Sequence, residues 1–271
     1  MRILHLSPLT CASATPAILS LLLTIIFTGF ILLSKILAPT GKLRVGVYTR
    51  SPQSLMLGQT PQDNYGMGYE LGREFARYLA LPFEPVVFEK NGDVLAAAKR
   101  GVIDLALVNA TPVRAEYLDF AEAILFSAQS YLIGAHCDVR DMANLDHEGI
   151  VVGVSSGSTS ETVLPALLQR AKVVAINSLD EVTRLLNQAK IDAFGTNKGI
   201  LFELAKHSPG SIVLDGAWGF ERIALGIPKG RSTALPLLQA FCKDIQTNGF
   251  LEAAAQRAGM QGVSFSESAS T

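Results

Sequence analysis

One cation stands among hydrogen-bonding groups between two apolar stretches of this chain. The sequence reads NATPVR from Asn109 to Arg114. Proline is favoured at the first position of a helix, where its missing N–H costs nothing. The pattern therefore predicts that a strand ends near Asn109 and that Arg114 lies in the first turn of the next element. A guanidinium placed there can hold a carboxylate through two parallel hydrogen bonds. A surface arginine in an ordinary turn is the alternative.

A second group of small polar residues follows later in the chain. The sequence reads SSGST from Ser155 to Thr159 and continues with Glu161 into a predicted helix. Small residues let the backbone approach a ligand, and the free N–H groups of a helix start favour an anion. Ser158 or Thr159 could equally serve only as the cap of that helix. Opposite Arg114 in a cleft, this segment would complete a clamp for a carboxylate.

The elements that must position these groups alternate between strands and helices. Such alternation indicates βαβ units around a parallel sheet that is covered on both faces. The series restarts after residue 149, which indicates two similar α/β halves with a cleft between them. The predicted strands cover 43–48, 84–88, 103–108, 149–154, 172–176 and 193–196, and the predicted helices cover 70–79, 94–100, 160–169 and 179–188.

The chain is expected to cross twice between the two halves. Short extended apolar segments near 130–135 and 222–227 suit a hinge. Lobe 1 would then combine 42–129 with 228–265, and lobe 2 would span 130–227. A ligand is expected in the cleft, because hinged lobes commonly close around what they bind.

The order and spacing of these motifs resemble the family-3 periplasmic solute-binding proteins, the binding components of amino-acid uptake transporters. The resemblance extends from Leu43 to Phe265 and includes the Gly68 to Leu71 run, the Asp104 to Arg114 segment, and the stretches 153–159 and 191–197. It implies an α/β, two-lobed type II periplasmic-binding-protein-like fold with two hinge crossovers. It also implies that an arginine of lobe 1 and a helix start of lobe 2 hold the α-carboxylate of an amino acid.

Position 197 departs from the family pattern. The family places an acidic residue there for the ligand's α-ammonium, whereas this chain has Asn197. A neutral amide cannot form that charge-assisted bond, which argues against a standard α-amino acid. Tyr48 is a candidate aromatic wall or a core residue, and Asn109 replaces the usual Ser or Thr. The predicted ligand-binding residues are Asn109, Thr111, Arg114, Ser158, Thr159, Asn197 and Tyr48.

The N-terminal segment is apolar enough to need separate treatment. No Asp, Glu, Lys or Arg occurs from Ile3 to Ser34, and about 20 apolar residues suffice to span a bilayer. No A-x-A-like cleavage pattern follows, so an uncleaved signal anchor is favoured over a cleaved signal peptide for residues 1–41. Together with the resemblance, this hydrophobic helix predicts a location on the periplasmic side of the bacterial cytoplasmic membrane, anchored or released after cleavage. Residues 266–271 form a Ser-rich tail.

Charge and cysteine content argue against several other classes. With 23 Lys and Arg against 24 Asp and Glu, a formal net charge of −1 speaks against a nucleic-acid-binding surface. The four His residues are scattered, so neither a metal nor another cofactor is expected. Cys137 and Cys242 could pair in an oxidising compartment or be buried small hydrophobic residues.

These observations predict a solute-binding protein of an ABC-type uptake system rather than an enzyme. It would close on a small carboxylate-bearing ligand, an amino acid or a related organic acid, and deliver it to a permease. The alternative is a membrane-anchored ligand-sensing or regulatory domain.

Two enzymatic hypotheses have less support from the sequence. The run from Gly66 to Leu71 also resembles the non-catalytic domain of membrane-bound lytic transglycosylase F, but no lysozyme-like domain with its glutamate is present. A few family members are dehydratases, but the sequence places no acid or base over a ligand.

Overall fold

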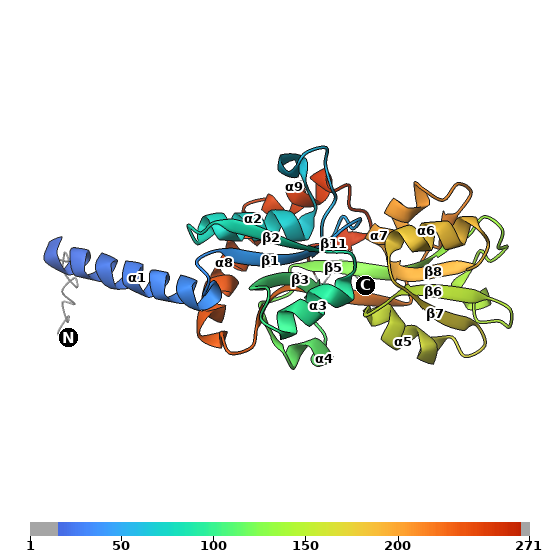
Figure 1. Ribbon diagram of the computed structural model, residues 1–271, viewed down its shortest axis with the longest axis horizontal. Helices are drawn as coiled ribbons and strands as arrows, with labels where there is room; N and C mark the ends of the chain where they lie inside the picture. Colours follow the sequence, from blue (N-terminus) through green and yellow to red (C-terminus); the bar gives the residue numbers. More distant parts are fainter. Residues whose placement is uncertain (1–15, 267–271) are drawn as a thin grey trace, which may run out of the picture.

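The computed structural model of this protein describes residues 16–266. In that part of the chain, eleven strands form one mixed sheet, and helices cover both of its faces (Figure 1). The strands are β1 (Leu43–Tyr48), β2 (Phe83–Phe88), β3 (Leu105–Asn109), β4 (Leu118–Phe120), β5 (Leu125–Ile133), β6 (Val151–Ser155), β7 (Lys172–Ile176), β8 (Ala193–Asn197), β9 (Ile212–Val213), β10 (Gly219–Pro228) and β11 (Val263–Ser264).

Helices of about two to six turns alternate with these strands, together with a four-residue α-helix and short 3-10 helices. The α-helices are α1 (Pro16–Leu37), α2 (Met67–Tyr78), α3 (Asn91–Lys99), α4 (Pro112–Ala115), α5 (Thr159–Leu167), α6 (Leu179–Asn187), α7 (Lys198–Ala205), α8 (Leu235–Thr247) and α9 (Phe250–Arg257). The 3-10 helices are η1 (Pro61–Asp63), η2 (Met142–Asn144) and η3 (Ser232–Ala234).

Every strand and helix predicted from the alternation is present, with ends that differ by at most three residues. The largest differences lie at helix starts. Helix α3 begins at Asn91 rather than Val94, because its first turn is polar and apolar periodicity cannot detect it. Apolar spacing therefore locates the buried part of a helix better than its exposed first turn.

The sheet is not wholly parallel, which corrects the prediction from the alternation. Strands β2, β1 and β3 pair in parallel at one end, as β7, β6 and β8 do at the other. Between them, the long strands β5 and β10 run antiparallel to each other and to their outer neighbours β8 and β3. Residues 223–228 of β10 pair with β3 and β4. The two strands thus join a first half, containing β1–β3, to a second half, containing β6–β8.

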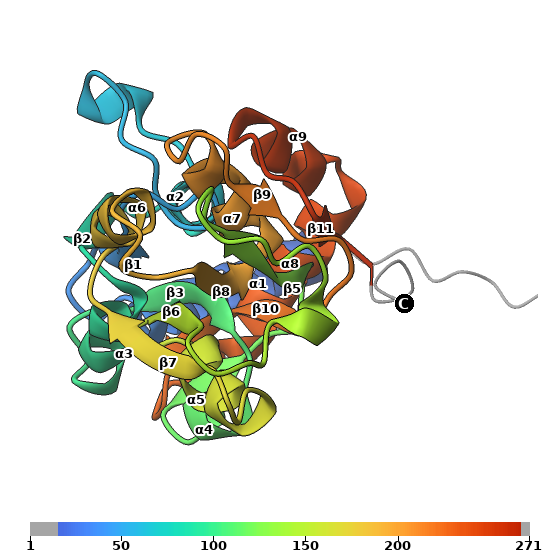
Figure 2. The same ribbon diagram turned by 90° about the vertical axis from the view of Figure 1, so that its right-hand side faces the viewer.

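Each half has its own apolar cores. In the second half, helix α5 packs on one face of the sheet and helices α6 and α7 pack on the other, as the view along the long axis shows (Figure 2). Cys137 lies in a core of the second half, whereas Cys242 lies in the largest core of the first half. Both are free, buried thiols, so the possible disulfide is absent. Burial raises the pKa of Cys242 to about 12, which keeps its thiol protonated.

Helix α1 leaves the first half at the end of the molecule farthest from the second half (Figure 1). Its last turns belong to the core: Phe30, Leu33 and Ile36 pack against buried residues, and Leu37 is fully buried. By contrast, the side chain of Phe27 is 67% exposed. The C-terminal end of α1 is therefore a structural part of the first half.

The predicted N-terminal anchor and C-terminal tail fall partly outside the described residues. Residues 1–15 of the former and 267–271 of the latter are not described by the structure. Within the described part of the chain, no helix has both the length and the apolar character needed to cross a membrane.

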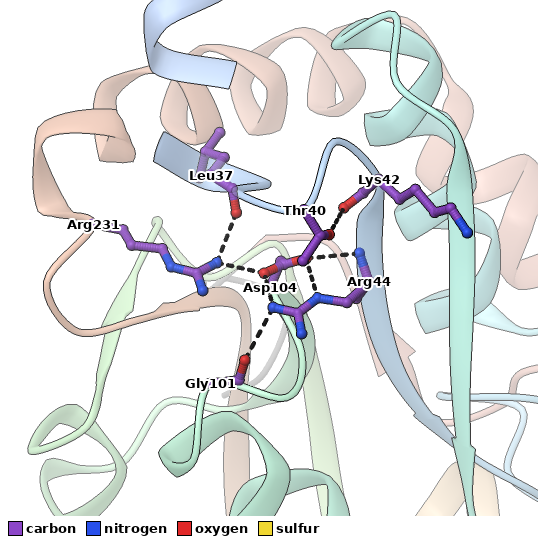
Figure 3. Close-up of polar contacts among 7 residues, drawn as sticks. All are labelled: Leu37, Thr40, Lys42, Arg44, Gly101, Asp104 and Arg231. Atoms are coloured by element: carbon purple, nitrogen blue, oxygen red, sulfur yellow. Dashed lines mark hydrogen bonds and ion pairs between the residues drawn. The ribbon is translucent and has the colours of Figure 1, made fainter. Parts of the chain in front are cut away.

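A buried carboxylate ties α1 to three other segments (Figure 3). Asp104, which is fully buried, accepts hydrogen bonds from Arg44 Nη2 at 2.7 Å and from Arg231 Nη1 at 2.6 Å. Arg231 also donates to the carbonyl oxygen of Leu37 at 2.7 Å, and Arg44 donates to that of Gly101 at 3.0 Å. One carboxylate therefore connects β1, the loop before β3, the segment after β10 and the end of α1.

Candidate ligand-binding site

A polar cavity lies where the two halves meet, beside the ends of β3, β6 and β8. The volume open to the centres of water molecules is about 40 Å³, which is room for a few waters. A larger ligand would require the halves to separate before it enters. The cavity is lined by six of the seven predicted site residues, namely Tyr48, Asn109, Arg114, Ser158, Thr159 and Asn197.

Arg114 reaches the cavity from the short helix α4. Thr111 is the N-cap of this helix, and its Oγ1 accepts a hydrogen bond from the backbone N–H of Arg114 at 3.3 Å. Thr111 itself does not line the cavity; its hydroxyl positions the arginine instead. Arg114 is only 6% exposed, and its Nη1 donates to the carbonyl oxygen of Asn109 at 3.0 Å. Burial lowers the pKa of Arg114, while the negative charge of Glu221 works in the opposite direction.

The start of α5 faces α4 across the junction. Ser158 is the N-cap of α5 and accepts a hydrogen bond from the backbone N–H of Glu161 at 3.2 Å. Thr159 Oγ1 accepts from Nδ2 of Asn109, in the other half, at 3.0 Å. The two parts of the predicted clamp therefore lie on opposite walls of one cavity, with Asn109 joining them.

Asn197 and Tyr48 are held by protein contacts at the edge of the cavity. The Asn197 side chain caps α7 by accepting from the N–H of Ile200 at 3.1 Å, and it donates to Gln53 Oε1 at 3.2 Å. The Tyr48 hydroxyl accepts from Ser51 Oγ at 3.3 Å. Burial raises the pKa of Tyr48 to about 12, so the phenol stays neutral. Both residues combine a structural role with a surface toward the cavity.

Glu221 is an acidic cavity residue that is not among the predicted site residues. It lies on β10, and its Oε1 accepts a hydrogen bond from Asn109 Nδ2 at 3.1 Å. Desolvation raises the pKa of Glu221, while the charge of Arg114 and the neighbouring hydrogen-bonding side chains oppose that rise. Apolar alternation would favour Phe220 as the inward residue, but in the structure Phe220 and Arg222 are exposed and Glu221 points inward.

Several contacts hold the halves together around the cavity. Lys90 Nζ donates to Asn177 Oδ1 at 3.1 Å, and Arg50 pairs with Asp180 at 2.8 Å. The backbones approach each other closely at Gly157, where an added Cβ would lie 2.7 Å from the Cα of Gly92. The structure thus has its two halves in close contact over the polar cavity.

Gly157→Ala is expected to keep the halves apart. The new methyl group would overlap the backbone at Gly92, and a φ of +75° adds left-handed strain of about 1–2 kcal/mol. Gly249→Ala is the matched control, because Gly249 has a φ of +77° and its added Cβ would contact nothing within 4 Å. Small-angle X-ray scattering should give a larger radius of gyration for Gly157→Ala alone. Equal radii for the two variants would contradict a steric role for this contact.

Known proteins share both sequence and fold with this chain. No protein-family model matches it. It is 25% identical to a glutamine-binding protein of Geobacillus stearothermophilus over 131 residues, which are 48% of this chain and 50% of that protein. It is 23% identical to the ABC transporter glutamine-binding protein GlnH of Bacillus subtilis over 160 residues, covering 59% and 56%. The chain thus spans about half the length of the curated relatives it matches.

Solved structures show the same fold over most of the chain. The solute receptor for L-cysteine of Neisseria gonorrhoeae superimposes with a TM-score of 0.73 at 24% identity, covering 81% of this chain and 90% of the receptor. This chain therefore has the fold of the type II periplasmic amino-acid-binding proteins. Another solved structure of similar fold is an amino acid ABC transporter substrate-binding protein of Streptococcus pneumoniae bound to L-arginine, with a TM-score of 0.74, 18% identity and coverage of 85% and 99%. The resemblance of residues 66–71 to lytic transglycosylase F gains no support from these proteins.

Proposed function

We propose that this chain is the ligand-binding component of an ABC-type amino-acid uptake system. It would close on a small carboxylate-bearing ligand in the cavity between its halves and release it to a permease. One observation carries this proposal: Arg114, an almost fully buried guanidinium, faces Thr159 across a polar cavity. The glutamine-binding names of two relatives support an amino-acid or related ligand.

In this proposal, the halves are lobes that move about two crossovers. Strands β5 and β10 would supply the connections that the sequence predicts near 130–135 and 222–227. The pairing of residues 223–228 with β3 and β4 supports a second crossover a few residues earlier, near 219–222. Lobe 1 would contain 42–129 and the chain after the second crossover. Closing and opening about these strands would admit a ligand larger than the present cavity.

We further propose that the protein works outside the cytoplasm, held at the membrane by its N-terminal segment or released from it. The packing of the end of α1 into the first half supports a mature protein that retains these turns. Edman sequencing of the protein from membrane and soluble fractions tests whether the mature protein retains these turns. A mature N-terminus beyond Leu37 would contradict it, because cleavage there would remove a buried side chain.

Thermal unfolding in the presence of candidate ligands tests the proposed function. Amino acids and organic acids should be screened at increasing concentrations, since a ligand that binds only the folded state stabilises it by about 2.7 kcal/mol at 100 times its Kd. We expect a concentration-dependent rise in Tm with a subset of the carboxylates, and recovery of the bound compound unchanged. No shift with any carboxylate would contradict the proposal, and conversion of the compound would indicate an enzyme instead.

A further inference from the structure

We propose that Glu221 binds the ammonium group of the ligand, so that the site selects small molecules that carry both a carboxylate and an amine. The inference rests on the proposed function and refines its ligand class. It also reverses the expectation from Asn197, which argued against an α-amino acid. The acidic partner would come from the strand β10 instead of the start of α7.

Geometry places Arg114 and Glu221, two groups of opposite charge, on the same cavity, which Glu89 and Lys90 also line. Arg114 enters from α4 and Glu221 from β10. Each shifts the pKa of the other, yet in the described part of the chain no direct ion pair joins them. Asn109 lies between the two walls, because its Nδ2 is within 3.1 Å of Glu221 Oε1 and 3.0 Å of Thr159 Oγ1. The two charges are therefore available to opposite ends of a small ligand.

Charge balance in the buried site favours a zwitterion. Arg114 and Glu221 together are neutral, and a ligand with one carboxylate and one ammonium keeps the closed cavity neutral. The other two charged lining residues, Glu89 and Lys90, also balance each other, so a carboxylate without an amine would give the cavity a net negative charge. Buried charges are tolerated only when they are paired and hydrogen-bonded, so the second case is disfavoured.

Asn197 is not free to replace the missing acid. Its Oδ1 accepts from the N–H of Ile200, and its Nδ2 donates to Gln53. Both ends of the amide thus serve the cap of α7 and a contact between the halves. The amide also carries no negative charge, so a charge-assisted bond to an amine must come from another lining residue, and Glu221 offers a carboxylate beside the clamp.

Gln129 is a second polar group near Glu221. It is 2% exposed, and neither atom of its side-chain amide has a hydrogen-bond partner among the described residues. Its proximity opposes the rise in the pKa of Glu221. Buried amides are normally hydrogen-bonded to protein, water or ligand. By opposing that rise, Gln129 favours the ionised form of the Glu221 carboxylate, which is the form that would bind an ammonium group.

Isothermal titration calorimetry with matched ligand pairs tests this inference. Each pair combines an amino acid with the same acid lacking its amine: L-glutamine with 4-carbamoylbutanoic acid, L-arginine with 5-guanidinopentanoic acid, and L-cysteine with 3-mercaptopropanoic acid. The wild-type protein should bind one amino acid at least tenfold more tightly than its partner. Glu221→Gln should lose this preference by weakening amino-acid binding, whereas Glu252→Gln, at an exposed glutamate of α9, should behave as wild type.

The possible outcomes separate the two proposals. Equal binding of both members of a pair by the wild-type protein would overturn the role of Glu221 and leave the carboxylate site intact. Tighter binding of the amine-free acids by Glu221→Gln, without loss of amino-acid affinity, would show that Glu221 occupies the ligand site and would also overturn the inference. Absence of binding by every pair would overturn the proposed function with it. Because the wild-type comparison needs no variant, poor folding of Glu221→Gln would not prevent the test.

Discussion

Asp104→Ala is expected to lower the free energy of unfolding by about 3–5 kcal/mol, the cost of removing one partner from a buried ion pair. Asp104 is fully buried, and the side chains of its partners Arg44 and Arg231 are only 18% and 14% exposed. The alanine would leave both guanidinium groups without their counter-charge. It would also loosen Leu37, because the Nη1 atom of Arg231 that contacts Asp104 also binds the Leu37 carbonyl. Urea unfolding, followed by circular dichroism, would measure the loss.

Asp180→Ala is the control for this prediction. Asp180 also pairs with an arginine, Arg50, but these side chains are 58% and 60% exposed. Exposed pairs of this kind contribute about 0–1 kcal/mol. A similar loss of stability in the two variants would mean that burial does not increase the contribution of the Asp104 contacts to the free energy of unfolding. A change in the slope of the urea transition would instead indicate an altered denatured state.

The Asp104 cluster shows which part of the fold the sequence could not predict. Apolar periodicity located the strands and helices, because burial of one face repeats along the chain. Asp104, however, lies 60 residues from Arg44 and 127 from Arg231. No local pattern links such residues, and the contact exists only after β1 and β3 have paired. The antiparallel course of β10 was missed for the same reason.

The residues of the candidate site also differ in whether a local sequence pattern could predict them. Arg114 and Ser158 could be placed from local signals, since proline at the first helical position and serine at an N-cap each have a defined geometry. Thr111 was predicted to bind a ligand, but its hydroxyl caps α4. Glu221 reaches the cavity because β10 pairs with β5 and β3, and this register was not evident from sequence. Long-range strand pairing thus supplies the residue on which ligand selectivity is proposed to depend.

Arg114→Ala is expected to weaken binding of the ligand found in the screen by about 2–5 kcal/mol, the usual cost of truncating one partner of a buried charge pair. This corresponds to a rise in Kd of about 30-fold to several thousandfold. Arg114→Lys should recover only part of the loss, because an ammonium cannot form the two parallel hydrogen bonds of a guanidinium. Arg73→Ala, at an exposed position of α2, is the control. Unchanged affinity in Arg114→Ala would refute the carboxylate role.

Stability separates the binding role of Arg114 from its structural role. The alanine variant leaves the Glu221 carboxylate in the cavity without the cation that opposes the rise in its pKa. It should therefore be destabilised at neutral pH, where the folded state must either hold an unpaired charge or take up a proton. The double variant Arg114→Ala with Glu221→Gln removes that charge and should regain part of the stability, but not the ligand affinity. Additive losses of stability in the double-mutant cycle would show that the two groups do not interact.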